Sequence, residues 1–333
     1  MTTENALRER RIRVNRGIMA HENTPLAIFL AALIAASGAV TKGLSVRPAN
    51  MANILANSSV RGLGAIGETF VILVTGIDLS IGGVGKFASV IGASMMTQAA
   101  HLSIVSHPAP IFVGMLATVL VGLGFGALNG LGTARIMVPA LITTLAMWKI
   151  ADGFTYVVTH GRNITNLPDA LGFFGTGKIG GIPVLVIVFV VVAILAYFVL
   201  NYTRYGRAIY AIGGNSVSAW LSGINVRQMV FSVYLICGLL AGLAATLTTA
   251  RTLSASFQTL TGFELDAIAA AVVGGISLMG GRGNIIGTVL GNVVIGVVNN
   301  MMAILGAKPT VQGIGKGAII FIAVAVDVWR RRR

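Results

Sequence analysis

The sequence has few charged residues, few acids and almost no cysteine. Charged residues make up 10% of the 333 residues, and only 10 of them are Asp or Glu, whereas about 25% of a soluble domain is charged. Cys237 is the single cysteine, so the chain can form no internal disulfide and no paired-thiol metal motif. The histidines at 21, 101, 107 and 160 show no metal-ligand spacing. These shortages argue against a soluble domain, a disulfide scaffold and a zinc site.

Apolar residues dominate the composition instead. Hydrophobic residues make up 55% of the chain, the mean hydropathy is +0.86, and there are 43 glycines. Because lipid supplies no hydrophobic force between helices, small residues that allow close approach are typical of membrane packing. A span needs roughly 20 apolar residues to cross a core of about 30 Å. We therefore expect an all-α polytopic membrane protein with about ten spans, some of them broken or short: 26–43, 62–77, 83–100, 110–131, 138–158, 182–200, 229–250, 265–280, 284–306 and 312–329.

The basic residues favour a membrane orientation over nucleic-acid binding. The formal net charge is +14, but the charges cluster outside the apolar runs. Ten spans place both termini on one side. That side then holds more basic residues than the other, which is typical of a cytoplasmic face. Its basic residues are Arg8, Arg10, Arg11, Arg13, Arg16, Arg135, Arg204, Arg207, Arg227, Arg282 and Arg330 to Arg333.

The same pattern predicts the domain organisation. We expect a basic cytoplasmic segment over 1–25, a single transmembrane domain over 26–329 and a basic cytoplasmic end over 330–333. The basic start followed by an apolar run is similar to a signal peptide, but it lacks a convincing small-residue cleavage site. We therefore expect an uncleaved first span.

A polar segment over residues 201–228 interrupts the spans and carries a local helix motif. Asn215 can accept the first free amide protons of a short helix, and Gly223 can take the left-handed conformation that ends it. An apolar stripe follows at i, i+3, i+4 and i+7: Val217, Trp220, Leu221 and Ile224. A stripe exposed to water is typical of a docking surface. A helix lying against its own bundle or against the lipid surface explains the pattern equally well.

Two glycine-rich junctions between spans are too short to be ordinary loops. One is Thr75 to Gly83 and contains Asp78, and the other is Val273 to Gly283. A broken helix at membrane depth is tolerated only against protein or water, where its free backbone groups offer polar contacts. We therefore place Asp78 near a helix break.

Two further glycine motifs match nucleotide-binding patterns only in part. Gly172 to Lys178 begins like a phosphate-binding loop, but Ile179 occupies the position of the magnesium-binding hydroxyl and no strand precedes it. Gly62 to Gly67 matches a dinucleotide fingerprint but lies within a span, where helix packing explains it better. The sequence also contains no catalytic constellation. We therefore expect no enzyme activity and no cofactor in this chain, so that energy must come from another one.

Ionisable residues within spans are costly in hydrocarbon and usually face an interior or a cavity. Glu68 and Lys86 lie on neighbouring spans, and either contact a translocation path or form a buried ion pair; we prefer the pair. Lys149 and Asp152 are spaced i, i+3 and could neutralise each other. Helix capping alone would explain the acids that open the eighth span, and Lys316 lies within the last span. Those two acids are Glu264 and Asp266.

Taken together, several motifs between residues 55 and 328 resemble one family, the permease subunits of ABC importers for monosaccharides, of the ribose type. The motifs run from Ala65 to Ile72, from Gly76 to Gly82, from Tyr205 to Val226, from Glu264 to Ala270 and from Gly274 to Gly283.

The resemblance implies a bacterial inner-membrane protein with the ABC importer permease fold. It implies that the helix around Trp220 couples the permease to an ATPase, which would bind ATP and magnesium. It also implies a periplasmic sugar-binding protein and a second permease chain, identical or different. The coupling residues would be Tyr205, Gly206, Gly213, Gly214, Asn215, Trp220, Leu221 and Gly223. The translocation path or helix breaks would hold Glu68, Asp78, Ser80, Glu264, Asp266 and Arg282.

Three residues depart from the family pattern. Glu68 stands where an apolar residue is usual, Thr75 replaces a glycine, and Lys86 is unexpected in the third span. These departures leave the sugar and the partner permease open. The alternative function is an ion-coupled secondary transporter, with Asp78, Glu68 or Asp152 as the coupling carboxylate.

Overall fold

The computed structural model describes residues 23–331, without the side chains at 309–310, 320, 323–324 and 326–331. Most of the predicted basic segments therefore lie outside the described residues. Within them the chain is a bundle of helices, and its one sheet is a pair of two-residue strands, β1 (Lys178–Ile179) and β2 (Ile182–Pro183). The prediction of an all-α polytopic protein is confirmed, whereas the predicted domain boundaries stay a prediction.

Ten helices correspond in order to the ten predicted spans. They are α2 (Thr24–Val40), α3 (Pro48–Leu73), α4 (Ile81–Met96), α5 (Ile111–Gly130), α6 (Ala140–Thr159), α8 (Val184–Tyr202), α11 (Val226–Thr252), α12 (Phe263–Val273), α13 (Ile285–Ile304) and α14 (Pro309–Arg331). Four helices of the described chain are long and apolar enough to cross a membrane by length and composition alone: α5 with the π-helical turn η2 (Leu131–Arg135), α8, α11 and α13.

Helix α3 begins well before the predicted start of the second span at residue 62. Its first half is rich in asparagine and serine, which an apolar count rejects. Helix α13 satisfies some of these groups: the side chains of Asn50 and Asn300 exchange hydrogen bonds of 2.8 and 2.9 Å, and Asn292 Nδ2 donates to the Ser58 backbone oxygen at 2.7 Å. Asn57 and Ser59 instead donate to backbone carbonyls of α3 itself. Polar residues are accepted in this helix because a neighbouring helix pairs with them.

Helix α12 is shorter than the predicted span 265–280. It ends at Val273, and the following segment takes positive φ angles at Gly275 (88°), Gly280 (79°) and Gly281 (68°). Such angles suit glycine and cannot continue a right-handed helix. The prediction of helix breaks at both glycine-rich junctions is confirmed, since α3 ends at Leu73 and α4 starts at Ile81.

The centre of the bundle is α11, which packs against α5, α3 and α4. At its crossing with α5, an added Cβ on Gly122 or Gly126 would collide with the backbone of α11, and one on Gly238 would collide with α5. The helices therefore meet backbone to backbone, as small-residue motifs allow in membranes. The glycines of 62–67 also serve packing, because Gly64 and Gly67 face Phe263 and Cys237.

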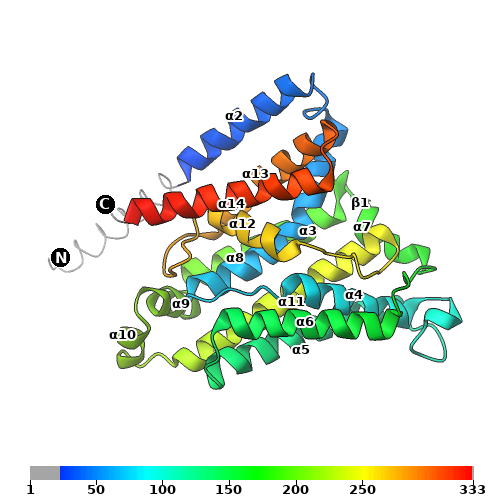
Figure 1. Cartoon of the computed structure of the whole chain (residues 1–333), viewed down its shortest axis with the longest axis horizontal. Helices are drawn as coiled ribbons and strands as arrows, with labels where there is room; N and C mark the ends of the chain where they lie inside the picture. The colour runs from blue at the N-terminus through cyan, green and yellow to red at the C-terminus, as the bar shows by residue number, and fades with distance from the viewer. Residues whose placement is uncertain (1–22, 332–333) are drawn as a thin grey trace.

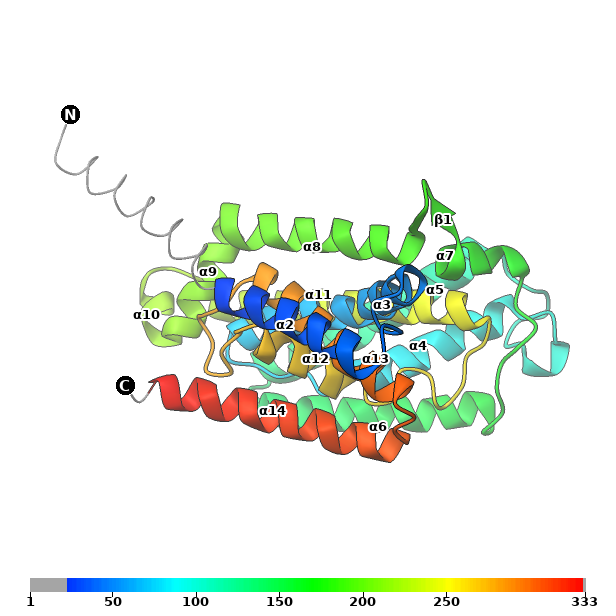
Figure 2. The same cartoon turned by 90° about the horizontal axis from the view of Figure 1, so that it is seen from above.

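Two short helices, α9 (Arg204–Gly214) and α10 (Ser216–Leu221), form one end of the molecule. The first turn of α2 and the last turns of α14 lie at that same end in both views (Figures 1 and 2). The described ends of the chain are therefore on one side, as an even number of spans predicts. The small helical segments η1 (Ala100–Leu102), η3 (Asp169–Leu171) and α7 (Gly172–Thr176) lie in the connections far from α9 and α10.

Candidate functional site

The predicted short helix at Asn215 is present as α10. Asn215 Oδ1 accepts a hydrogen bond of 2.9 Å from the Ser218 backbone N–H, which caps the first turn. Gly223 follows the helix with φ of 84°, the left-handed conformation that its position predicted. Local sequence alone thus fixes where this helix starts and stops.

The apolar stripe of α10 has three members rather than four. Val217, Trp220 and Leu221 are 64%, 65% and 73% exposed. Ile224 lies beyond the end of the helix and is half-buried against the core. The stripe therefore continues for one turn only, and Ile224 instead fastens the end of α10 to the bundle. Val217, Trp220 and Ile224 border a surface depression of about 760 Å³.

Helix α9 connects α10 to both helix breaks. A Cβ on Gly213 would collide with the Leu73 carbonyl and the backbone of Gly281. Those two residues are themselves joined, because the Gly281 N–H donates to Leu73 O at 2.9 Å. Tyr210 adds a second link, its hydroxyl donating to Gly283 O at 2.8 Å. The end of α9 therefore touches the break after α3 and the break after α12 at one point.

The remaining predicted coupling residues differ in how tightly they are held. Gly206 lies so close to the end of α8 that a side chain would collide with the Leu200 backbone, whereas Gly214 is open. The hydroxyl groups of Tyr205 and Ser232 lie 2.7 Å apart and hydrogen-bond α9 to α11. Burial raises the pKa of the Tyr205 hydroxyl above its ordinary value, which already keeps the group protonated near neutral pH. Arg282 lies exposed in the junction beside α9.

Three of the predicted path residues, Glu68, Asp78 and Ser80, form one cluster with Asn129, and we call these four the sealed carboxyl cluster. Their exposures do not exceed 1%. Asp78 Oδ1 accepts from the Ser80 hydroxyl at 2.6 Å and the Ser80 N–H at 2.9 Å. Asn129 Nδ2 donates to Ser80 Oγ at 2.7 Å and approaches both Asp78 carboxyl oxygens at 3.3–3.4 Å. The cluster closes the break between α3 and α4.

Glu68 enters this cluster from α3 without a cation as partner. Its Oε2 accepts from the Asp78 N–H at 3.4 Å, and its Oε1 has no partner. The predicted Glu68–Lys86 ion pair is therefore wrong, because Lys86 points the other way from α4 and bonds to α6. Sequence spacing could not decide which face of α4 Lys86 occupies.

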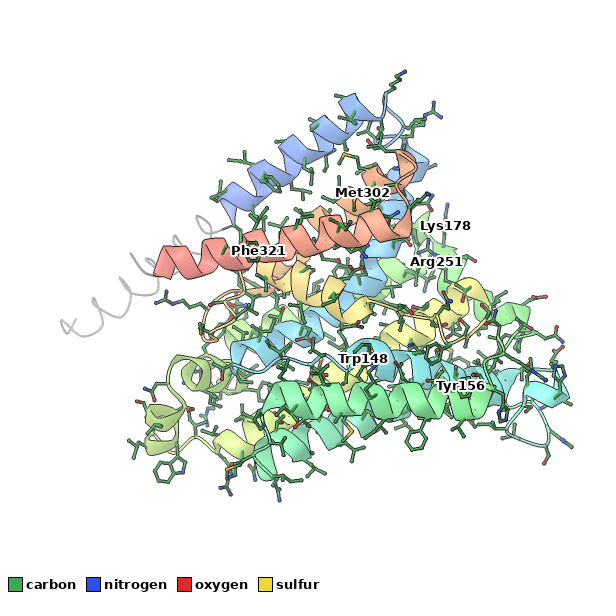
Figure 3. All side chains as sticks on the ribbon, in the orientation of Figure 1. Trp148, Tyr156, Lys178, Arg251, Met302 and Phe321 are labelled. Atoms are coloured by element: carbon green, nitrogen blue, oxygen red, sulfur yellow. The ribbon has the colours of Figure 1, made fainter. Side chains whose placement is uncertain are left out.

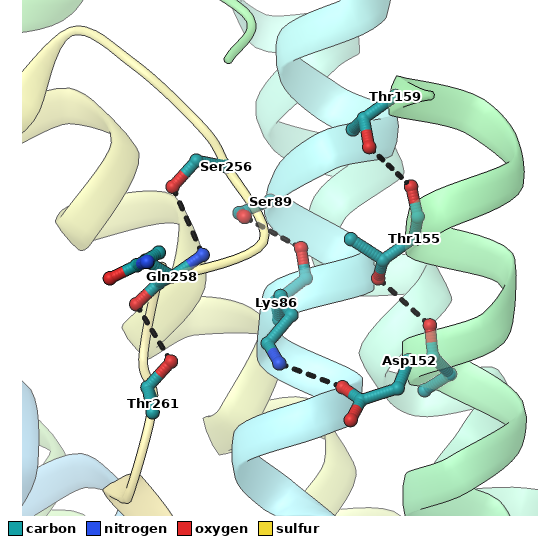
Figure 4. A network of polar contacts seen from close by, with 9 residues as sticks. Lys86, Ser89, Asp152, Thr155, Thr159, Ser256, Gln258 and Thr261 are labelled. Atoms are coloured by element: carbon teal, nitrogen blue, oxygen red, sulfur yellow. Dashed lines mark hydrogen bonds and ion pairs between the residues drawn. The ribbon is translucent and has the colours of Figure 1, made fainter. Parts of the chain in front are cut away.

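A second polar group lies between α6 and α14, and we call it the ionic belt: Lys86, Asp152, Glu264, Asp266 and Lys316. Lys86 Nζ lies 2.7 Å from Asp152 Oδ1, joining α4 to α6 (Figure 4). Lys316 Nζ lies 2.8 Å from Asp266 Oδ1 and 3.0 Å from its Oδ2, joining α14 to α12. The predicted Lys149–Asp152 neutralisation is therefore wrong, because Lys149 lies over the Trp148 ring, 4.3 Å from its centroid.

Glu264 is the third acid of the belt and forms no salt bridge of its own in the described chain. It lies near the Lys86–Asp152 pair and near Asp266. Its carboxylate packs where Gly82 of α4 has no side chain, since a Cβ there would collide with Glu264 Oε2. Both acids lie in the first turn of α12, where the helix dipole favours them. Capping alone does not explain them, because Asp266 also holds Lys316.

The ionic belt is partly exposed, whereas the sealed carboxyl cluster is buried. The side chains of Asp152 and Lys316 are 16% and 29% exposed. Phe257, in the segment 253–262 before α12, is 41% exposed and places its ring 4.1 Å from Lys86 Nζ. Figure 3 marks the two helices that flank the belt, with Trp148 and Tyr156 on α6 and Phe321 on α14.

Sequence reasoning missed Asn129 and Phe257 at these two sites. Asn129 is an amide inside an apolar span, which was a usable signal because such groups need a partner in hydrocarbon. Phe257 gave no signal, since an aromatic residue in a connection is common. No group of three metal-ligating His, Cys, Asp or Glu side chains occurs in the part of the chain that the structure describes.

Comparison with known proteins gives a consistent family. Residues 50–324 match the family model described as "Branched-chain amino acid transport system / permease component". The chain is 41% identical over 282 residues to the ribose import permease protein of Escherichia coli strain K12, covering 84% of this chain and 85% of the relative. It is 36% identical over 299 residues to the D-allose transport system permease protein of that strain, covering 90% and 89%.

A third relative comes from another organism. The fructose import permease protein of Rhizobium meliloti is 34% identical over 320 residues, covering 92% of this chain and 85% of the relative. No solved structure matches the chain. The apolar helices and the match over residues 50–324 agree on a multi-pass inner-membrane protein, and the chain belongs to this family of permease components, which are transport subunits rather than enzymes.

Proposed function

We propose that this chain is the membrane permease of an ATP-driven importer and forms the path for a monosaccharide. The family and the ribose, D-allose and fructose import permeases among its relatives support this assignment. The observation that carries the mechanism is the exposed apolar face of α10, on a segment tied through Gly213 to both helix breaks. None of these relatives supports the ion-coupled alternative.

The partners follow from the assignment. A separate ATPase subunit binds ATP and magnesium and docks on α10, where the exposed faces of Val217, Trp220 and Leu221 lose water. A periplasmic sugar-binding protein delivers the sugar at the opposite end of the bundle. A second permease chain, an identical or a related one, completes the path.

We infer that α9, α10 and both termini of the permease face the cytoplasm. The ends of α2 and α14 lie beside α9 and α10 in Figures 1 and 2, and the sequence assigns this side the larger share of basic residues. Cytoplasmic loops carry such an excess of Lys and Arg. The ATPase, which uses cytoplasmic ATP, then meets α10 on the correct side.

Motion of the ATPase reaches the path through backbone contacts. When the ATPase dimer closes on ATP it shifts α10, and α9 moves with it because Asn215 is the only residue between them. At Gly213 the movement meets Leu73 and Gly281, which end α3 and follow α12. Broken helices can change direction at such points at low cost, since their backbone bonds are already interrupted.

A charge on the apolar face tests the docking role. Trp220→Asp is expected to abolish ATP-driven uptake and to lower co-purification of the ATPase, because docking would bury an unpaired carboxylate. Gln228→Asp, an exposed position in the same 201–228 segment, adds the same charge away from the face and should leave both unchanged. Normal uptake by Trp220→Asp would overturn the assignment of α10.

A further inference from the structure

The ionic belt differs from an ordinary structural ion pair in its position. Asp152 lies in the middle third of α6, and Lys86 lies within α4, so both are at membrane depth. Ionisable groups at such depth are expensive and are usually kept where they face a cavity or a path. The belt also spans four helices, α4, α6, α12 and α14, rather than one contact.

The charge of the belt is nearly balanced. Its two lysines each pair with one carboxylate, and Glu264 is the third acid beside them. Each lysine is within 2.8 Å of a carboxylate oxygen, which leaves no free cation to hold an anion. Because its lysines are paired, the belt is a poor binding site for an ion. It still offers hydrogen-bond donors and acceptors to an uncharged molecule with many hydroxyl groups.

Phe257 supplies the apolar part of the same surface. Lys86 Nζ lies 4.1 Å from the ring centroid, and the residue remains 41% exposed. The segment that carries it is held by hydrogen bonds from Ser256 N–H to Thr259 Oγ1 at 2.9 Å and from Thr261 Oγ1 to Gln258 O at 3.0 Å. Figure 4 shows Ser256, Gln258 and Thr261 of this segment beside the helix that carries Lys86, with Asp152 on the next helix. Small-molecule sites combine aromatic surface with a few polar groups in this way.

We propose that Lys86, Asp152 and Phe257 contact the sugar during passage and determine which sugars pass. The hydroxyl groups of the sugar exchange hydrogen bonds with the Lys86–Asp152 pair, and its C–H face packs on the Phe257 ring. The contact is transient, because each polar group already has a partner to return to. This inference rests on the proposed importer function and adds a selectivity step to it within the permease.

The first experiment measures access to the belt without requiring transport. Cys237 is buried and is the single cysteine, so Phe257→Cys introduces one reactive thiol. In the assembled transporter, a charged methanethiosulfonate reagent should modify it, and 100 mM D-ribose should slow the reaction at least threefold. Ile194→Cys, on the exposed face of α8, should not react, because it faces lipid. No modification at position 257, or no protection by D-ribose, overturns the proposal.

The second experiment separates passage from coupling. Proteoliposomes containing the permease, the ATPase and the loaded binding protein are assayed for uptake of D-ribose, D-allose and D-fructose and for ATP hydrolysis. Lys86→Met/Asp152→Leu removes both partners together, which avoids leaving Asp152 or Lys86 unpaired. We expect about tenfold slower uptake, by an unequal factor for the three sugars, since a lost hydrogen bond to a charged group has that effect. ATP hydrolysis should stay within twofold of the wild type.

Lys149→Met is the matched control, because this lysine is exposed on α6 and belongs to no ion pair of the belt. Equal uptake by the paired variant and wild type overturns the selectivity role. A parallel fall in uptake and ATP hydrolysis overturns it too, because the defect then lies in coupling. If wild-type proteoliposomes import none of the three sugars, the proposed monosaccharide function fails instead.

Discussion

The sealed carboxyl cluster and the ionic belt both place carboxyl groups at membrane depth. They provide hydrogen-bonding partners for those groups in opposite ways. Asp78 receives neutral donors from Ser80 and Asn129 and is closed to solvent. The belt pairs acids with lysines and stays partly open. Neutral donors fixed in a closed core hold a backbone break in shape, whereas exposed ion pairs can exchange partners. The first arrangement serves stability, and the second serves passage.

The largest expected effect is on the sealed cluster. Asp78→Leu removes the acceptor of the Ser80 hydroxyl and of the Ser80 N–H, leaving two buried donors without that partner, whereas the Asn129 amide keeps its bond to Ser80 Oγ. We expect a loss of about 3–4 kcal/mol in stability, at about 1–3 kcal/mol for each unsatisfied donor with partial relaxation. Thermal unfolding of purified protein in detergent measures this. A melting temperature equal to that of the wild type would show that the cluster does not hold the break.

The second prediction concerns removal of one partner from the more buried ion pair. Lys86→Met leaves Asp152 alone beside Glu264 and should cost about 2–3 kcal/mol, somewhat less than a fully buried pair, because Asp152 retains some solvent. Lys86→Met/Asp152→Leu should recover most of this loss in the same melting experiment. If the paired variant were less stable than the single one, the pair would be holding the fold rather than serving the path.

A smaller effect is expected at the edge of the sealed cluster. Asn129→Ala removes one donor from Ser80 Oγ and weakens two longer contacts with Asp78. Asp78 Oδ1 keeps its two hydrogen bonds from Ser80, so a loss of about 1–2 kcal/mol is expected. Urea or thermal unfolding of the variant beside Asp78→Leu would test the ranking. A larger loss for Asn129→Ala than for Asp78→Leu would reverse the account of which residue organises the cluster.

The smallest effect belongs to the outer ion pair. Lys316 is 29% exposed, so solvent already screens the pair and water can take the place of the ammonium group beside Asp266 in Lys316→Met, and about 1 kcal/mol is expected. The melting temperature should also respond less to added salt in Lys316→Met than in wild type, because salt weakens exposed pairs. A loss as large as that of Lys86→Met would mean that the belt is uniformly buried.

The sequence was informative wherever one local rule decides the structure. Asn215 and Gly223 mark the ends of α10 through capping and a left-handed turn, and the apolar runs locate ten helices. The count of apolar residues missed the polar first half of α3. Asn50 and Ser58 in that half find hydrogen-bond partners in α13, more than 200 residues away.

The functional roles of the candidate site residues stay a prediction, and two of the pairings expected between them were wrong. Glu264 and Asp266 do lie together, and Asp78 and Ser80 lie at a helix break. The predicted partner of Lys86 was wrong. Whether Lys86 meets Glu68 or Asp152 depends on the rotation of α4 about its own axis after the break. That rotation is set by close packing at glycines such as Gly82 and Gly83, which accommodate Glu264 and Trp148. Tertiary contacts of this kind have no signature in a single sequence.

The shortness of α12 has a consequence for how the chain enters a bilayer during synthesis. Its 11 residues extend about 16 Å, roughly half of the hydrocarbon thickness. The glycine-rich segment after it takes part of its backbone hydrogen bonding from elsewhere in the fold, as when the Gly281 N–H donates to Leu73 O, and lipid cannot replace such a partner. This part of the chain therefore cannot partition as an independent hairpin, and it must be inserted together with α11 and α13. Maturation of the permease should stall at this step whenever either neighbour is truncated.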